Sequence, residues 1–115
     1  MPSILVQSNA VLTGEAGQQL LASLSQAVAE TIGKPERYVL ASLAPASLLM
    51  SGQAGPAAWV EVRSIGGLTA EVNGRLAERI CNLLARAANI KGDRVYLNFM
   101  DVPAPNWGWN GETFG

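Results

Sequence analysis

The chain has 115 residues and a mass of 12.1 kDa, which is the size of one domain. Hydrophobic residues make up 49% of it and charged residues only 15%, which excludes a disordered chain and favours an oligomer that covers part of the surface. The net charge of −1 lacks the basic excess that phosphate backbones attract, so we expect no nucleic-acid partner.

Two residue types that carry much of enzyme chemistry are scarce. The chain has no histidine, which removes the commonest general base, the histidine-containing triads and most zinc, copper and iron sites. Its one cysteine, Cys81, cannot form an intramolecular disulfide or a thiolate cluster, and its apolar neighbours predict a small buried hydrophobe. We therefore expect no metal and no cofactor.

The N-terminal sequence gives an expectation for localisation. MPSILVQSN has no basic segment and only a short apolar run, unlike a secretory signal, and no window has the roughly 18 apolar residues of a membrane span. We expect a cytoplasmic protein with no signal peptide and no membrane partner, for which leaderless release stays open.

The spacing of apolar residues predicts two β-α-β units in chain order. The predicted elements are strand 3–8, helix 16–32, strand 38–43, strand 59–64, helix 69–88 and strand 95–100. The motif KPERYVL at 34–40 recurs as KGDRVYL at 91–97, which is 57 residues later. This repeat indicates one domain over 1–115 built from a duplicated unit, with halves of about 1–57 and 58–115.

The predicted units imply an α+β fold with two layers. A helix between two strands joins a parallel pair, so both units can share one four-stranded sheet with the two helices on one face. In strand 59–64, Trp59, Glu61 and Arg63 oppose Val60 and Val62, so the other face is mixed. We expect other subunits to cover that face or the sheet edges.

The C-terminal residues after 101 are rich in Pro, Asn, Gly and Trp. Asn110-Gly111 is a turn signal, so a loop or small hairpin is expected there. Trp107 and Trp109 are interpreted either as pocket residues or as a lid over the core of the domain. The arginines of helix 69–88 (Arg75, Arg79, Arg86) are expected to form a solvated face.

Pro2 is the first candidate for chemistry. The initiator methionine is usually removed before proline, which would leave a secondary amine as a base in a chain without histidine. A terminal amine has a pKa of about 8, and burial near a cation lowers it towards neutrality. The alternative is a proline that only ends an edge strand.

Three further residues have both structural and functional interpretations. Lys34 follows Gly33 at a helix end, where it complements the helix dipole or binds an anion. Asn98 shares a strand face with Tyr96, and asparagine is disfavoured in strands. A ligand or a subunit contact would explain Asn98.

Together these residues resemble the macrophage migration inhibitory factor family of the tautomerase superfamily, in the same order over the whole chain. The matching blocks are Met1-Pro2 with Asn9, Gly33-Lys34-Pro35 with Tyr38, Ser64-Ile65-Gly66, Asp93-Arg94-Val95-Tyr96 with Asn98, and Gly108-Trp109-Asn110 with Thr113-Phe114. The resemblance implies a homotrimer of duplicated β-α-β units, each with a four-stranded mixed sheet, whose sheets surround a central axis with the helices outside.

The resemblance also implies an activity and its residues. Pro2, freed of Met1, would be the catalytic base of a keto-enol tautomerase. Lys34 and the backbone amide of Ile65 would bind the substrate carboxylate, and Tyr96 and Asn98 would enter the pocket from the neighbouring subunit. The implied pocket walls are Tyr38, Trp109 and Phe114, together with Trp107 at the rim. The implied substrate is a small aromatic 2-keto acid such as phenylpyruvate, or a dopachrome-like compound.

The sequence departs from the family at three places, and two alternatives stay open. Residues 57–60 are Ala-Ala-Trp-Val rather than a CxxC motif, so thiol oxidoreductase activity is not expected. Trp107 replaces a smaller apolar residue, and Arg63 adds a cation near the inferred site. One alternative is a cytokine-like signalling trimer with a vestigial pocket and a receptor protein as partner. The other is a structural trimer without a ligand.

Overall fold

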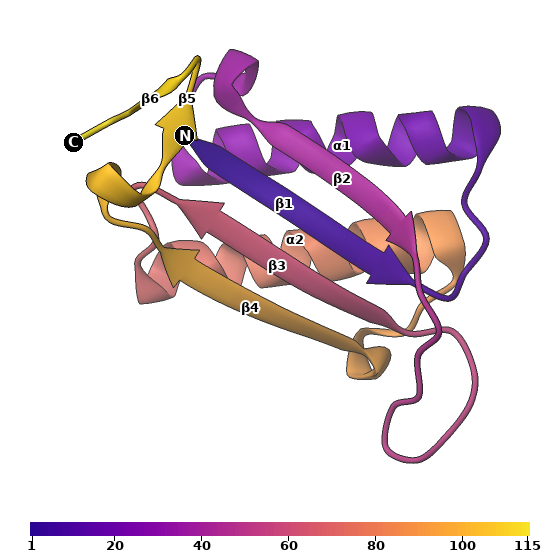
Figure 1. The fold of residues 1–115 in the computed structure, drawn as a ribbon. Coiled ribbons are helices and arrows are strands. Elements are labelled where there is room, and N and C mark those ends of the chain that lie inside the picture. Colours follow the sequence, from indigo (N-terminus) through magenta and orange to yellow (C-terminus); the bar gives the residue numbers. More distant parts are fainter.

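The computed structural model describes residues 1–115 as two layers, a sheet and a pair of helices (Figure 1). The main elements are β1 (Pro2–Ser8), α1 (Gly14–Ile32), β2 (Leu40–Pro45), β3 (Ala58–Ser64), α2 (Ala70–Ala88), β4 (Val95–Asp101), β5 (Gly108–Trp109) and β6 (Glu112–Thr113). Short 3-10 turns occupy η1 (Glu36–Tyr38), η2 (Gly92–Arg94) and η3 (Ala104–Asn106). No helix combines the length and apolarity needed to cross a bilayer.

The sheet has the strand order β2-β1-β3-β4. β1 and β2 are parallel, β3 and β4 are parallel, and the two central strands β1 and β3 run antiparallel. Each predicted β-α-β unit therefore contributes one parallel pair, and the two units meet in an antiparallel contact. Both helices lie behind the sheet in Figure 1, which confirms the α+β fold with a mixed sheet and both helices on one face.

The core lies between the sheet and the two helices. Both helices present apolar residues four positions apart, so that these residues line one side of each helix. The buried residues of these stripes are Leu20, Leu24 and Val28 on α1, and Leu76, Ile80 and Leu84 on α2. They pack against Ile4 and Val6 of β1 and Val60 and Val62 of β3. Burial of one such side chain contributes about 1.5 to 3 kcal/mol to stability.

Local sequence signals set the helix ends. Gly33 has a left-handed conformation with φ of 81°, and its N–H donates to the carbonyl of Ala29 at the end of α1. Asn89 takes the same conformation after α2. Thr69, predicted as the first residue of the second helix, is instead its cap, since its hydroxyl accepts the Val72 N–H at 3.1 Å.

The second predicted strand begins two residues later than expected. Tyr38 lies in η1, because its N–H donates to the carbonyl of Pro35 and the N–H of Val39 donates to that of Glu36. The chain thus completes a tight turn before β2 begins at Leu40. The β-rich residues at 38–40 indicated a strand. The backbone N–H of Tyr38 is instead bonded within the turn after Pro35, so it does not pair with a neighbouring strand.

Two predictions for α2 need refinement. Cys81 is half-buried rather than fully buried; it packs at the margin of the core, and this burial raises the pKa of its thiol. Arg79 is not simply solvated, since its Nη2 lies 2.6 Å from Oε1 of Glu30 and so joins the two helices.

The sheet face away from the helices is open in the single chain. Along β4, Tyr96, Asn98 and Met100 are exposed, whereas Leu97 and Phe99 on the opposite face are half-buried. β3 shows the predicted alternation, with Val60 and Val62 fully buried. A large aromatic and a methionine on an open face are features of a surface that contacts another chain.

Candidate functional site

The candidate site lies at the end of the sheet where β1 begins. The side chain of Pro2 is fully buried and belongs to the same face of β1 as Ile4 and Val6, which points to the helices. Pro2 pairs with Ser64, the last residue of β3. The terminus of the chain is therefore held in the sheet next to the point where β3 ends.

Lys34 and Ile65 meet at this end of the molecule. The Nζ atom of Lys34 donates to the carbonyl oxygen of Ile65 at 3.0 Å. The backbone N–H of Ile65 donates to the carbonyl oxygen of Met1 at 3.3 Å. The end of α1, the end of β3 and the start of β1 thus bring together three of the residues singled out in the sequence, namely Pro2, Lys34 and Ile65.

The N-terminal amine has an unusual electrostatic environment. Its pKa is lowered, first by burial, which disfavours the charged form, and second by the positive charge of Lys34. In the chain that retains Met1, this amine belongs to Met1, and the nitrogen of Pro2 is an amide without basicity. No group of three His, Cys, Asp or Glu side chains is placed to hold a metal ion.

Asp101 holds the turn at Ser64-Ile65-Gly66 in place, and this residue was not among those singled out in the sequence. Oδ1 of Asp101 accepts the N–H of Gly66 at 2.8 Å, and the hydroxyl of Ser64 donates to the carbonyl of Gly66 at 2.7 Å. Val102 N–H donates to the carbonyl of Ser64 at 2.8 Å. These bonds fix the backbone on which the amide of Ile65 sits. The only signal in the sequence was an aspartate at the end of a strand.

Gly67 lies close to the end of α1. A Cβ atom at Gly67 would lie 2.9 Å from Cγ2 of Ile32 and 3.6 Å from Cε of Lys34, and the φ of 82° favours glycine. A glycine at this position thus lets the loop after β3 pass close to Ile32, two residues before Lys34.

The predicted wall residues come from two segments. Trp109 and Phe114 stack with ring centroids 6.4 Å apart on the small β5–β6 hairpin, and both are exposed. The predicted turn of this hairpin is confirmed, because Asn110 and Gly111 both have positive φ angles, of 54° and 82°. Tyr38 is exposed on η1, and the guanidinium of Arg37 lies 4.6 Å from its ring centroid.

Trp107 lies just before this hairpin. Its carbonyl accepts the N–H of Phe114 at 3.2 Å, and its half-buried side chain lines a hollow shared with Ser3 and Arg63. Since Ser3 follows Pro2 directly, Trp107 belongs to the same end of the molecule as the N-terminus.

Tyr96 and Asn98 do not join this cluster within one chain. Tyr96 pairs with Trp59, whereas Ser64, the partner of Pro2, pairs with Asp101, five residues further along β4. At about 3.3 Å per residue the two positions are roughly 16 Å apart along the sheet. Both side chains are exposed on the open face. One chain alone therefore brings together only part of the predicted site.

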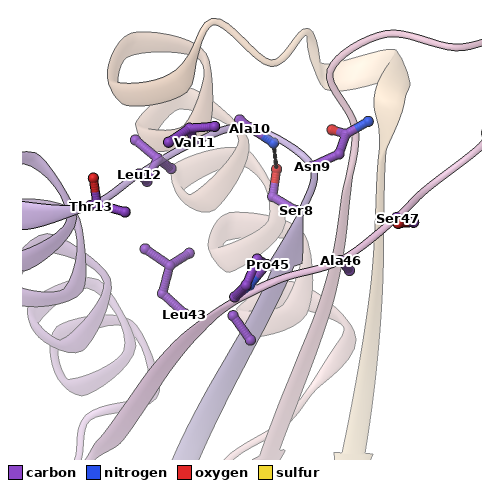
Figure 2. Close-up of a pocket in the computed structure, with 11 residues that line it drawn as sticks. Ser8, Asn9, Ala10, Val11, Leu12, Thr13, Leu43, Pro45, Ala46 and Ser47 are labelled. Carbon is purple, nitrogen blue, oxygen red and sulfur yellow. Dashed lines mark hydrogen bonds between the residues drawn. The ribbon is translucent and has the colours of Figure 1, made fainter.

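Figure 2 shows a second hollow of about 410 Å³ at the opposite end of β1, between residues 8–13 and 43–47. The hydroxyl of Ser8 donates to the carbonyl of Ala57 and accepts the N–H of Ala10. None of the lining residues carries a titratable side chain. With no group to take or give a proton, this hollow is not the centre of acid-base chemistry.

Comparison with known proteins gives one consistent result. The family model described as macrophage migration inhibitory factor matches residues 1–115. The macrophage migration inhibitory factor of Meriones unguiculatus is 36% identical over 115 residues, which is 99% of each chain. Two solved structures are similar over 98% of this chain: a homologue from Prochlorococcus marinus (40% identity, 99% of that chain, TM-score 0.92) and a macrophage migration inhibitory factor-like protein from Entamoeba histolytica (31% identity, 98% of that chain, TM-score 0.93).

Proposed function

The chain belongs to the macrophage migration inhibitory factor family, and on that premise we propose that it is a keto-enol tautomerase whose base is the amine of Pro2 after removal of Met1. Family membership and the tautomerase-type fold support an isomerase. The observation that carries the proposal is the convergence of the terminal amine, the Lys34 ammonium and the Ile65 amide at the start of β1.

The environment of the amine supports its role as a base. Removal of Met1 transfers the terminal amine to Pro2, whose ring is already fully buried. Burial and the charge of Lys34, which lower the pKa of the terminal amine in the longer chain, then act on a nitrogen one residue deeper in the fold. A pKa below the ordinary value of about 8 gives more neutral amine near pH 7.

The reaction needs only proton movement. In the direction from enol to ketone, the substrate loses its enol hydroxyl proton and gains a proton at the adjacent carbon, and the Pro2 nitrogen accepts a proton and returns it. Atoms and electrons balance without an oxidant or a metal. The reverse direction uses the same nitrogen to take the carbon-bound proton.

The carboxylate of a 2-keto acid fits the two donors beside the amine. While Met1 is present, its carbonyl accepts the Ile65 N–H, and removal of Met1 frees that N–H for a substrate carboxylate oxygen. The Lys34 ammonium has three N–H donors. One of them donates to the Ile65 carbonyl, so two are available to a substrate. The exposed rings of Trp109 and Phe114 favour an aromatic substituent such as the phenyl ring of phenylpyruvate.

A neighbouring subunit completes the proposed pocket. Tyr96 and Asn98 lie exposed on the open sheet face, and Tyr96 is too far from Pro2 in its own chain to contact the same small substrate. We infer that in a homotrimer they reach the Pro2 end of the adjacent chain. This explains why an asparagine, disfavoured in strands, stands on β4.

The test is a phenylpyruvate assay on two forms of the protein. The absorbance of the enol measures the rate of the reaction. One form has lost Met1, as checked by intact mass, and the other has an alanine inserted between Met1 and Pro2, so that the Pro2 nitrogen is an amide whether or not Met1 is removed. Proton transfer by a positioned base contributes about 10² to 10⁴ in rate, so the blocked form should lose at least 100-fold in kcat/KM. Equal rates of the two forms, with processed material excluded by mass, would reject Pro2 as the base.

A further inference from the structure

A hollow of about 260 Å³ adjoins the N-terminal residue pair on the open side of the sheet. It is lined by Ser3, Arg63, Val102, Asn106, Trp107 and Gly108. Ser3 and Arg63 are cross-strand partners on β1 and β3, next to the pair formed by Pro2 and Ser64. The Arg63 hollow, as we call this set of six residues, therefore begins one residue away from the proposed base.

The guanidinium of Arg63 in this hollow has only one ion-pair partner in the protein. Nη2 of Arg63 lies 3.3 Å from Oε2 of Glu61, and the other oxygen of that carboxylate accepts the indole N–H of Trp59 at 3.0 Å. The side chain of Arg63 is 50% exposed. A guanidinium has five N–H donors, and this one bond to Glu61 is the only hydrogen bond that Arg63 makes through its side chain.

The other groups in the hollow fit a carboxylate attached to an unsaturated or aromatic part. Ser3 and Asn106, whose side chains carry neutral hydrogen-bond donors, and Trp107, whose indole is flat and largely apolar, also line the hollow. A planar guanidinium binds a planar carboxylate through two parallel N–H bonds. The donors of the Arg63 hollow are thus suited to an organic acid with a flat body.

The Arg63 hollow and Lys34 lie on opposite sides of the sheet end. Lys34 comes from the end of the helix layer, and the side chain of Pro2 faces the same layer. Ser3 and Arg63 alternate with Pro2 and Ser64 and so face the open side. A molecule whose reacting carbon lies at the Pro2 nitrogen can direct one acidic group to each side.

We propose that the Arg63 hollow binds a second carboxylate, and that the preferred substrates are 2-keto acids with two acidic groups rather than one. This inference rests on the proposed tautomerase for the reaction itself. Beyond that function, it assigns Arg63 as a specificity-determining residue, with Ser3 and Asn106 as supporting donors. Lys34 alone is sufficient to bind a monocarboxylic acid. Lys34 and Arg63 on opposite sides of the base can each bind one carboxylate of a dianion.

Equilibrium binding of ligands that cannot tautomerise tests the inference apart from turnover. Isothermal titration calorimetry on the Met1-free protein would compare phenylacetate with 3-carboxyphenylacetate and 4-carboxyphenylacetate. At least one diacid should bind about tenfold tighter than phenylacetate, as a charge-assisted bond predicts. In R63Q this preference should disappear, and in R63K it should be partly kept, since the charge remains without the planar fork.

R75Q is the matched control, because Arg75 is an exposed arginine on α2 in the helix layer and its loss changes the net charge equally. The control should keep the full preference for the diacid. Equal binding of monoacid and diacids by the unchanged protein, absence of binding by either, or equal losses in R63Q and R75Q would overturn the inference.

Turnover separates the two proposals. Phenylpyruvate turnover without any Arg63-dependent preference for diacids would reject the second carboxylate site and leave the tautomerase. Arg63-dependent diacid binding without turnover of any keto acid would reject the tautomerase and leave the binding site. Circular dichroism of R63Q would confirm that the sheet is intact before either result is interpreted.

Discussion

Lys34 follows the helix C-cap Gly33, and its charge acts on the terminal amine; a role at the helix end and a role in substrate binding predict different results on substitution. After Gly33 ends α1, the ammonium reaches the Ile65 carbonyl at 3.0 Å. A group that acted only as a cap would affect stability and leave ligand selectivity unchanged. A group that binds the substrate carboxylate would affect free acids more than esters.

We expect Lys34→Ala to weaken binding of carboxylate substrates about 10- to 150-fold and to affect the corresponding methyl esters much less. The reason is that a charge-assisted hydrogen bond contributes about 1.5 to 3 kcal/mol and only the free acid accepts it with a full charge. Competitive inhibition constants for matched acids and esters measure the effect. Lys91→Ala is the control, since Lys91 is the equivalent residue of the second repeat and the only other lysine. Equal losses for acid and ester in Lys34→Ala would leave Lys34 as a helix cap.

The pH dependence of the reaction follows from the lowered pKa of the terminal amine. Below that pKa the amine is protonated and cannot accept a proton, so kcat/KM should rise with pH through one ionisation whose midpoint lies below 8. Since the charge of Lys34 helps to lower this pKa, Lys34→Ala should move the midpoint upward, although burial is the larger cause. A pH–rate profile of both proteins measures the shift. A midpoint at or above 8 in the unchanged protein would contradict the assigned environment.

At the scale of single residues, the sequence singled out candidates for chemistry more readily than the residues that position them. Pro2 and Lys34 stood out because a chain without histidine needs another base and because a lysine after a helix stop can bind an anion. Asp101 and Gly67 did not, because their partners lie 35 residues away in the chain for Asp101 and in the α1 segment for Gly67. Such contacts depend on strand register, which residue types alone do not specify.

Among the elements, the segment between β2 and β3 differs most from what the sequence indicated. No structure was predicted for residues 46–57, yet Met50 and Gln53 pair across a tight turn, with Ser51 and Gly52 at positive φ. The guanidinium of Arg94 donates four hydrogen bonds to carbonyls of this segment, on Met50, Gln53, Gly55 and Pro56, at 2.9 to 3.4 Å. Arg94 lies 38 to 44 residues later in the chain, so periodicity within the segment could not predict its order.

Arg94→Lys should therefore loosen residues 46–57 even though the charge is kept. An ammonium cannot reproduce a fork that reaches four carbonyls, and we expect a loss of about 1 to 3 kcal/mol in the free energy of unfolding. Urea unfolding measures the stability, and hydrogen exchange measures amide protection in the segment. Arg86→Lys on the exposed side of α2 is the control and should change neither. Unchanged amide hydrogen exchange in Arg94→Lys would mean that the turn at Met50–Gln53 is stable without the hydrogen bonds from Arg94.

For the whole molecule, the sequence predicted the open face and further copies of the chain as its cover, but not how those copies meet it. The alternation on β3 and β4 placed Tyr96, Asn98 and Arg63 on the side away from the helices, and the structure confirms this arrangement. How a second copy packs on that face depends on the shapes of two surfaces. The pattern of apolar and polar residues along one chain does not specify those shapes. The position of Tyr96 relative to Pro2 is the feature of the fold that makes a further copy necessary to the proposed site.

Mixing two inactive variants tests whether the site is shared between subunits. The first variant carries an alanine insertion before Pro2, which blocks the amine, and the second carries Tyr96→Phe with Asn98→Ala. Each protein alone should have little activity, because every site lacks either the base or the neighbouring side chains. In trimers reassembled from equal amounts, a site is intact when its Pro2 comes from the second variant and its Tyr96 and Asn98 from the first.

Random assembly gives each of these conditions a chance of one half, so about one quarter of the sites should be intact. The mixture should recover about a quarter of the kcat measured for the unchanged protein, after light scattering shows a mass three times the 12.1 kDa of the chain. The control is the same mixture without the denaturation and refolding that exchanges subunits, and it should stay inactive. If every site lay within one chain, no mixing could bring Pro2 and Tyr96 from different chains together. Activity of the reassembled mixture no higher than the average of the two variants would therefore reject the shared site.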